Sequence, residues 1–280
     1  MEQLSNLERF DAFYNVLKGT ITESHFSNLS SLVDLDLSFN LLTLNTSFDW
    51  VPPFQLQFIR LPSCNMGPFF PKWLQTQNNY TLLDISLANI SDMLPSWFSD
   101  FPPELKILNL SYNHISGRVH EFIILDLSEN GLSGKIPQCV NNFTILRQEN
   151  GTGESMDFQV RYDYIPRSYL YIGDLFIQWK NQESEYKNAL LYLKIIDLSS
   201  NKLVGGIGQI KLLESLDLSR NQLSGMIPQD FANLTFLSVL DLSNNHLSGR
   251  IPSSTQLQSF DRSSYSGNAQ LCGPPLEECP

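Results

Sequence analysis

The sequence predicts a solenoid, a stack of short coils that place their strands side by side in one curved parallel sheet. The first observation is that leucine makes up roughly one residue in six and is spread along the whole chain. The second is that the chain aligns on itself with one template, Leu-x-x-Leu-x-x-Leu-x-Leu-x-x-Asn-x-Leu-x-Gly-x-Ile-Pro. The cleanest copy runs from Leu234 to Pro252. Its leucine Leu237 lies 24 residues after the equivalent Leu213 of the preceding copy.

This period falls within the roughly 20–29 residues of leucine-rich repeats, and each template position has a physical role. Both leucines of Leu-x-Leu point into the core from a short strand. The Asn is expected to bury its amide and bond the backbone of its own coil and the next. Gly-x-Ile-Pro turns the chain into a second extended run on the flank. One repeat cannot bury its apolar face alone, so the repeats must stack. Strands are expected around Leu35, Ile59, Leu83, Leu108, Leu125, Ile196, Leu216 and Leu240.

The fold class expected is therefore an α/β solenoid, a right-handed superhelix with a concave parallel β-sheet. Two joins are short: Leu105 to Phe122 is 17 residues and Leu193 to Leu213 is 20, which suggests deleted material and local strain in the stack. An aromatic-rich stretch without the template is expected to fold onto the solenoid rather than form a flexible linker. The expected organisation is leucine-rich repeats over 1–147 without an N-terminal cap, an island insertion over 148–191, repeats over 192–252 and a C-terminal cap over 253–280.

Composition excludes several classes of protein. The 280 residues carry a formal net charge of −11, with a pI near 4.7, which argues against binding the phosphates of nucleic acid. No window approaches the ~18 consecutive apolar residues of a membrane span. His120-Glu121 begins like a zinc-helix motif, but Ile124 stands where the second His is needed. No other acid, base and nucleophile converge, so we expect no enzymatic activity, no metal and no cofactor.

Cysteines and glycosylation signals indicate the secretory route. Cys272 and Cys279 flank a tight Gly-Pro-Pro turn and are expected to form a disulfide. Cys64 stands at the Asn position of its repeat, and Cys139 follows Ile-Pro. Both side chains are expected to be buried and to lie far apart along the solenoid; a disulfide between them is the alternative. The absence of a visible signal peptide would by itself indicate the cytosol. The cysteine pair and the dense Asn-x-Ser/Thr acceptors disagree, so we expect an extracellular protein whose N-terminal part is missing. Asn109 lies on an expected strand, while the glycosylation sites expected on the flanks and convex side are Asn28, Asn45, Asn79, Asn142, Asn150 and Asn233.

Two columns of residues are expected on the concave face. Between the strand leucines lie mostly Asp residues, which are interpreted either as a carboxylate array for cations or a basic ligand, or as a solvated face habitual in such repeats. The residue before each Asn varies more, and either forms a recognition surface or reflects ordinary surface variation. From these columns we expect a ligand to contact Phe39, Arg60, Tyr112 and Glu129.

The repeats, the aromatic stretch and the ending SYSGNAQLCGPPLEEC together resemble plant receptor-like proteins with leucine-rich-repeat ectodomains, of the disease-resistance and ethylene-inducing-xylanase-receptor type. Members of this family often carry a Tyr-x8-Lys-Gly element in the island. Tyr171 and Lys180 keep that spacing, but Asn181 replaces the Gly. The resemblance implies a cell-surface receptor without a kinase domain, located at the plasma membrane when full-length. It also implies that the receptor senses an extracellular protein or peptide and pairs with a co-receptor kinase through the island and the last repeats.

The expected co-receptor site combines the island with the strand face after it. A long insertion must bury its aromatic residues, and the adjacent solenoid offers the only large surface for them. The island tyrosines then either anchor a partner or only pack the island down. The residues expected at this site are Tyr162, Tyr169, Tyr171, Lys180, Arg220 and Asn244. A second class of function stays open, because soluble plant inhibitors of wall-degrading enzymes use similar repeats.

Overall fold

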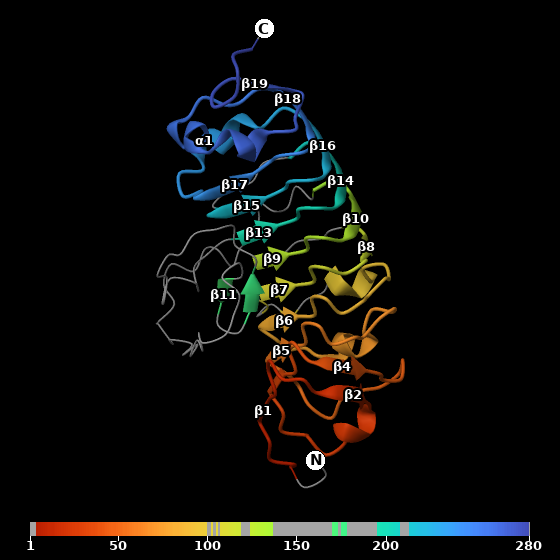
Figure 1. The fold of residues 1–280 in the computed structure, drawn as a ribbon. Helices are drawn as coiled ribbons and strands as arrows, with labels where there is room; N and C mark the ends of the chain where they lie inside the picture. The colour runs from red at the N-terminus through yellow and green to blue at the C-terminus, as the bar shows by residue number, and fades with distance from the viewer. Residues whose placement is uncertain are drawn as a thin grey trace.

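The computed structural model describes residues 4–99, 102, 105, 107–118, 124–136, 170–172, 175–177, 195–207 and 213–279. Its main feature is a nine-stranded sheet whose strands all pair in parallel and follow one another along the stack (Figure 1). The strands, in spatial order, are β1 (Arg9–Asp11), β3 (Asp34–Asp36), β5 (Phe58–Arg60), β6 (Leu82–Asp84), β7 (Ile107–Asn109), β9 (Ile124–Asp126), β13 (Ile195–Asp197), β15 (Ser215–Asp217) and β17 (Val239–Asp241).

All eight strand positions expected from the leucine pattern are confirmed, since each expected central residue is the middle residue of a strand. The two short joins do not break the ladder. Leu108 pairs with Leu125, and Ile196 pairs with Leu216, in the same register as the other coils.

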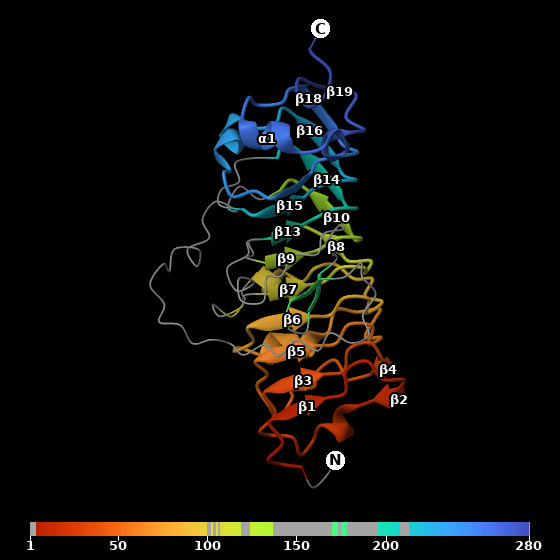
Figure 2. The same cartoon turned by 60° about the vertical axis from the view of Figure 1, so that its left-hand side comes forward.

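A second parallel sheet runs along the flank, on the opposite long side of the stack in Figures 1 and 2. A second extended run on the flank is confirmed, but most of its strands lie in the Asn-x-Leu-x-Gly part of the repeat and end at the glycine, before the Ile-Pro to which the expectation assigned them. The six-stranded sheet contains, in order, β19 (Gln270–Cys272), β18 (His246–Arg250), β16 (Gln222–Gly225), β14 (Lys202–Gly205), β10 (Gly131–Gly134) and β8 (Ser116–Gly117), and a separate pair near the N-terminal end contains β2 (Lys18–Ile21) and β4 (Leu41–Leu44).

Short helical turns close several coils on the remaining side. They have a single turn or little more because the repeat leaves few residues between its flank strand and its next core leucine. The turns are the 3₁₀ helices η1 (Glu23–His25), η2 (Lys72–Thr76), η3 (Ser96–Ser99) and η7 (Gln229–Asn233). No helix within the described ranges is long and apolar enough to cross a membrane.

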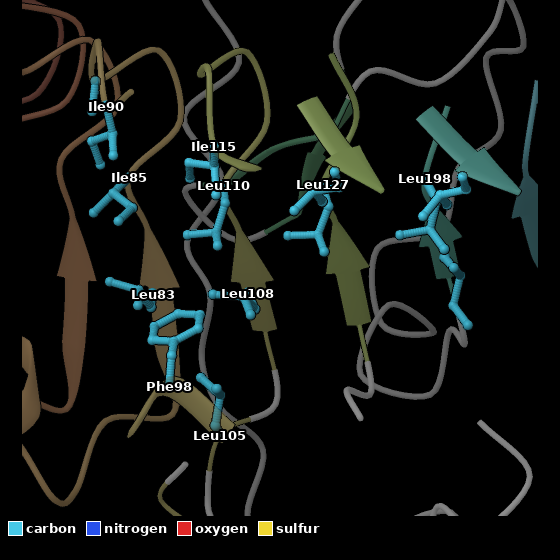
Figure 3. Packing of buried hydrophobic residues seen from close by; sticks show 14 of the residues in the cluster. Leu83, Ile85, Ile90, Phe98, Leu105, Leu108, Leu110, Ile115, Leu127 and Leu198 are labelled. Atoms are coloured by element: carbon cyan, nitrogen blue, oxygen red, sulfur yellow. The ribbon is translucent and has the colours of Figure 1, made fainter. Parts of the chain in front are cut away.

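Leucine and isoleucine side chains from both sheets meet between them in one continuous core (Figure 3). Leu83 and Leu108 point inward from neighbouring concave strands, and Ile115 comes from the start of the flank run. Phe98, from η3, closes the same layer and is 1% exposed. Because every coil contributes to this core and to its neighbours' layers, stability is shared along the stack rather than held in one repeat.

An asparagine ladder joins the coils. Nδ2 of Asn113 donates to the carbonyl oxygens of Leu110 in its own coil and Ile85 in the preceding coil, both at 3.0 Å. Its Oδ1 accepts from the backbone N–H groups of Ala88 and Ile90 at 3.1 and 3.0 Å. The expectation that the Asn reaches the next coil is therefore wrong, because the amide faces the preceding one. At Cys64 the thiol replaces the amide and donates to the carbonyl of Leu37, the same preceding-coil position.

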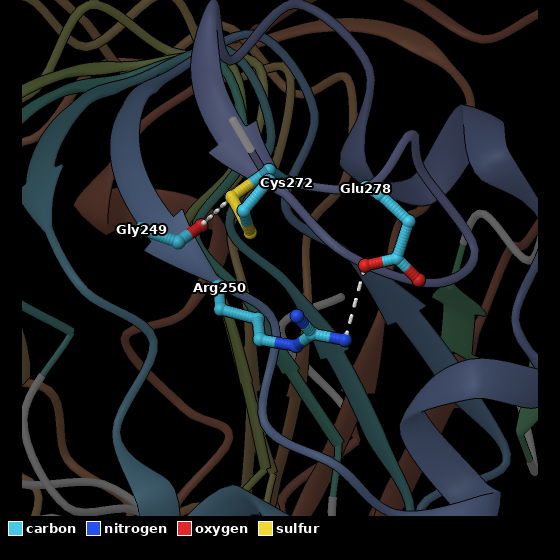
Figure 4. The surroundings of a disulfide bond; sticks show 5 residues. Gly249, Arg250, Cys272 and Glu278 are labelled. Carbon is cyan, nitrogen blue, oxygen red and sulfur yellow. Dashed lines mark hydrogen bonds and ion pairs between the residues drawn. A yellow bond between two sulfur atoms is a disulfide. The ribbon is translucent and has the colours of Figure 1, made fainter.

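The C-terminal residues cover the last coil. Asn268 continues the ladder, and the hydroxyl of Tyr265 in η8 (Arg262–Tyr265) donates to the carbonyl of Leu257 in α1 (Thr255–Ser259) at 2.7 Å. Cys272 and Cys279 form a disulfide. Figure 4 shows this bond beside Gly249 and the ion pair between Arg250 and Glu278, whose Nη2 and Oε2 lie 3.2 Å apart.

Within the island, the described residues form one antiparallel hairpin of β11 (Leu170–Ile172) and β12 (Leu175–Ile177). Figures 1 and 2 both place this hairpin beside the concave sheet, at the level of β6 and β7.

Candidate functional site

The column between the strand leucines is buried from Asp36 to Asp126 and half-buried at Asp197, Asp217 and Asp241. Asp84 is 0% exposed, and its Oδ1 accepts from the backbone N–H and the hydroxyl of Ser86 at 3.0 and 2.7 Å. Asp126 and Ser128 repeat this pattern at 3.0 and 2.7 Å. The carboxylate of the Asp-x-Ser step thus accepts hydrogen bonds from the turn that follows the strand. The expectation of a solvated face is wrong for the five buried positions of the column, Asp36 to Asp126. The column contains Asp36, Arg60, Asp84, Asn109, Asp126, Asp197, Asp217 and Asp241.

Burial changes the chemistry of these carboxyl groups. It raises the pKa of Asp36 to about 6 and that of Asp84 to about 7, against the hydrogen bonds from Ser38 and Ser86. The pKa of Asp197 is raised well above its ordinary value by burial first and then by the neighbouring carboxylates of Asp126 and Asp217. No three described His, Cys, Asp or Glu residues are arranged to hold a metal ion. The hydrogen bonds that Asp84 and Asp126 accept hold the turn after each strand and so support the concave face.

Arg60 is the basic exception in this column. Its Nη1 lies 2.9 Å from Oδ1 of Asp34 and 3.6 Å from Oδ2 of Asp36, and its guanidinium lies 5.3 Å from the ring centroid of Phe58. The side chain is only 3% exposed. Its charge is thus compensated within the sheet, and its contact with a ligand stays a prediction.

The variable column shares an unusual backbone conformation. Each residue directly precedes a ladder position and has a φ between 51° and 64°, a left-handed conformation that is rare outside glycine. Its N–H donates to a carbonyl of the following coil, as from Phe39 to Pro62 at 2.9 Å and from Tyr112 to Ser128 at 3.1 Å. The backbone bonds fix the direction of the side chains. We call this set the rim column: Tyr14, Phe39, Ser63, Leu87, Tyr112, Glu129, Ser200, Arg220 and Asn244.

The rim column divides into an apolar and a polar half. In the N-terminal half Tyr14, Leu87 and Tyr112 are exposed by 54%, 48% and 39%. The ring of Phe13 lies 5.7 Å from that of Tyr14 and 6.0 Å from that of Phe39, so aromatic contact continues across two coils. Tyr14 and Phe13 were not among the residues expected from the sequence. The signal was available, because Tyr14 directly precedes Asn15, the first ladder residue.

The polar half is tied together by Arg220. Its Nη2 lies 3.4 Å from Oε1 of Glu129, and its Nε donates to the hydroxyl of Ser200 on the coil between them. Glu129, expected at the ligand site, and Arg220, expected at the co-receptor site, therefore lie together. Asn244 is exposed on the next coil and donates to the hydroxyl of Ser243 at 3.2 Å.

The other sequence-predicted residues divide by location. Tyr171 lies in β11, paired with Phe176 of β12, while Tyr162, Tyr169, Lys180, Cys139, Asn142 and Asn150 fall outside the described residues. Asn109 is 2% exposed, and its Nδ2 donates to Oδ2 of Asp84 at 3.2 Å. The remaining four expected acceptors are exposed, namely Asn28, Asn45, Asn79 and Asn233.

Comparison with known proteins defines the class. The leucine-rich-repeat family model matches residues 104–124, 121–143, 212–234 and 236–257. Receptor-like protein EIX2 of Solanum lycopersicum is 54% identical over 464 residues, which cover 94% of this chain and 45% of the relative. The aligned length exceeds that of this chain, so the relative carries stretches that this chain lacks. Polygalacturonase inhibitor 1 of Phaseolus vulgaris is 46% identical over 89 residues, covering 31% of this chain and 26% of the inhibitor.

Solved structures show the same fold. A plant ice-binding protein covers the whole chain with a TM-score of 0.66 and 24% identity, over 77% of its own length. The ectodomain of the Arabidopsis thaliana receptor kinase GASSHO1/SCHENGEN3 also covers the whole chain, with a TM-score of 0.58 and 21% identity, over 32% of its length. At these identities the likeness concerns the fold alone.

The repeat ladder, the rim column and the family match define the chain as a leucine-rich-repeat protein. More specifically, it is a homologue of the plant leucine-rich-repeat receptor-like proteins, and it spans about half the length of EIX2.

Proposed function

We propose that this chain belongs to the extracellular ligand-sensing part of a plant cell-surface receptor without a kinase domain, which acts in defence through a co-receptor kinase. The observation that carries the proposal is the 54% identity with a receptor-like protein over 94% of the chain. The family is not enzymatic, which agrees with the absence of a catalytic cluster expected from the sequence.

The apolar half of the rim column is the proposed ligand surface. Protein and peptide recognition concentrates in a few aromatic and apolar anchors. Here such side chains stand on the coils of Tyr14 and Phe39 and on those of Leu87 and Tyr112, with Ser63 on the coil between the two pairs. Phe39 and Tyr112 are proposed anchors, and Tyr14 extends them toward the N-terminal end. Their left-handed backbone is held by bonds to the next coil, so little ordering is needed when a ligand binds.

The polar half is the proposed co-receptor surface, together with the island. Arg220 and Asn244 are exposed on successive coils after the island, and Arg is a common anchor of protein interfaces. Tyr162, Tyr169, Tyr171 and Lys180 are the island residues proposed to take part. The membrane anchor and signalling belong to the full-length protein in this proposal.

The test compares the secreted chain with a variant in which residues 148–191 are replaced by a short flexible linker. Both are assayed for capture of leucine-rich-repeat co-receptor kinase ectodomains, and circular dichroism checks that the deletion leaves the repeats folded. We expect the intact chain to capture a co-receptor and the deletion to lose it. A folded deletion variant that pairs as well as the intact chain contradicts the proposal.

A second candidate is a soluble inhibitor of a secreted wall-degrading enzyme, supported by the 46% identity with a polygalacturonase inhibitor over 89 residues. In that case the concave face binds the enzyme, and the island is not needed for inhibition. Inhibition of polygalacturonase by both the intact chain and the deletion variant, without co-receptor capture by either, would favour this candidate.

A further inference from the structure

The flank sheet carries a positive cluster on an acidic molecule. Arg118, Lys135 and Lys202 are exposed at β8, β10 and β14, and none of them forms an ion pair in the structure as described. The segments 113–118, 130–136 and 201–207 contain no Asp or Glu, although the chain has 29 acidic residues against 18 Lys and Arg. We call these three residues the cation cluster.

Strand register brings the three charges together. β8 pairs with β10, and β10 with β14, in a register that puts Arg118 and Lys202 on either side of Ser133. Their backbones are thus two strand spacings, about 10 Å, apart. Lys135 follows directly after β10, is exposed, and lies beside Gly205 of the next coil. Residues from three repeats, 84 positions apart at the extremes, make one patch.

Two of these side chains lie against glycines of the next coil. A Cβ built on Gly134 would lie 3.4 Å from Cγ of Arg118, and one on Gly205 would lie 3.2 Å from Cγ of Lys135. Both glycines have a positive φ, +91° and +84°. The aliphatic stems of Arg118 and Lys135 therefore lie across the next coil, and both charged groups are directed along the stack. This alignment suits a ligand that runs along the flank.

We propose that the cation cluster binds a linear polysaccharide that carries carboxylates. Charge complementarity requires an anion, and the neighbouring groups on the face, such as the hydroxyl of Ser133 and the amide of Gln222, suit a hydroxylated partner. Three exposed apolar side chains lie on or beside this sheet: Met93, bridged to Ser116 of β8, Val204 in β14, and Met226 directly after β16. None of the described flank strands carries the aromatic anchors typical of protein interfaces. Nucleic acid demands many phosphate contacts, and the three cations of this face supply few.

This site lies on the flank sheet and not on the rim column, so the inference goes beyond the receptor proposal and does not depend on it. A protein with such a site would be retained on an acidic extracellular matrix while its concave face stays available.

The experiment measures binding of the 280-residue chain to immobilised polygalacturonate at low and high salt. The test variant carries Arg118→Gln, Lys135→Gln and Lys202→Gln. The matched control carries Lys18→Gln, Lys72→Gln and Arg262→Gln, which are exposed and change the net charge equally. A third variant with Lys135→Arg and Lys202→Arg keeps the charge. Circular dichroism establishes that all variants are folded.

We expect the chain to bind at low salt and more weakly at about 0.3 M salt, where surface charges are screened. The test variant should bind at least tenfold more weakly, while the control stays within twofold and the Lys→Arg variant binds like the unmodified chain. Failure of the chain to bind at low salt overturns the proposal, as does equal weakening by the control. Equal binding to polyglutamate, or tighter binding to phosphatidylserine vesicles, would assign the cluster to an acidic protein or a lipid surface and overturn it too.

Discussion

Arg220 and Glu129 form an ion pair across 91 positions of sequence, with Nη2 of Arg220 3.4 Å from Oε1 of Glu129. The island separates them in the chain, yet they stand two coils apart on the rim column, with Ser200 between them. The guanidinium therefore links the last coil before the island to the coils after it. The solenoid is continuous across the insertion, which leaves the two halves of the rim column on one surface.

The first prediction concerns the strength of this pair. Both side chains are about half exposed, so solvent screens their attraction and the cost of ordering them offsets it. A double-mutant cycle with Arg220→Gln and Glu129→Gln should give a coupling free energy below about 1 kcal/mol, measured by thermal unfolding. A coupling of several kcal/mol would mean that the pair holds the stack together.

The second prediction concerns the asparagine ladder. Asn113→Ala removes the hydrogen bonds to the carbonyls of Ile85 and Leu110 and those from the N–H groups of Ala88 and Ile90. It therefore leaves buried backbone groups without partners. The variant should lose about 2–4 kcal/mol of unfolding free energy in urea. The control is Asn15→Ala, whose exposed amide donates only to carbonyls of its own coil. Equal losses in the two variants would contradict the role assigned to the ladder.

The third prediction follows from the raised pKa of Asp84, about 7 in the fold against 3.8 ordinarily. Between these values the folded state binds more protons than the unfolded state, so stability should fall as pH rises from 4 to 7. Asn109 already occupies this column and accepts the same bonds from Ser111, so Asp84→Asn should fold normally.

The Asp84→Asn variant should therefore show a flatter dependence of melting temperature on pH between 5 and 8, and a higher melting temperature than the unmodified chain at pH 8. Asp49→Asn, at an exposed position, controls for the loss of one charge. Parallel pH profiles for the unmodified chain and Asp84→Asn would show that Asp84 ionises as easily in the fold as in the unfolded chain.

The fourth prediction concerns glycosylation. Asn28 is exposed shortly after η1 and Asn233 is exposed as the last residue of η7, so both should carry glycans in plant-expressed protein. Asn109 should not, since its amide is buried on β7 and bonded to Asp84. Mass spectrometry of glycopeptides measures the occupancy. Full occupancy of Asn109 with bare Asn28 and Asn233 would contradict the assignment of these faces.

Leucine spacing was sufficient to predict the strands, because a two-residue period fixes which side chains must be buried. Gly-x-Ile-Pro predicted that a second run exists on the flank, but most of its strands end at that glycine and lie in the residues before it. The burial of Asp84 was missed because nothing in Asp-x-Ser tells a solvated carboxylate from one whose oxygen is taken up by the following turn. The left-handed backbone of Phe39 and Tyr112 was missed because it depends on bonds to the next coil, and aromatic residues rarely adopt it.

Contacts between site residues on distant coils could not be predicted from the sequence either. Glu129 and Arg220 were assigned to different surfaces, since an insertion of unknown path lies between them. Only the register of β9, β13 and β15 brings them together. The cation cluster has the same origin, because Arg118, Lys135 and Lys202 come from three repeats.

The most direct test of the receptor proposal is quantitative co-receptor capture by the secreted 280-residue chain and two folded variants. Arg220→Glu with Asn244→Arg changes the polar half of the rim column, while Phe39→Ala with Tyr112→Ala changes the apolar half. We predict that the first variant loses co-receptor capture at least tenfold and that the second keeps it. Intact capture by the first variant, with loss in the second, would place the partner on the opposite half and contradict the account.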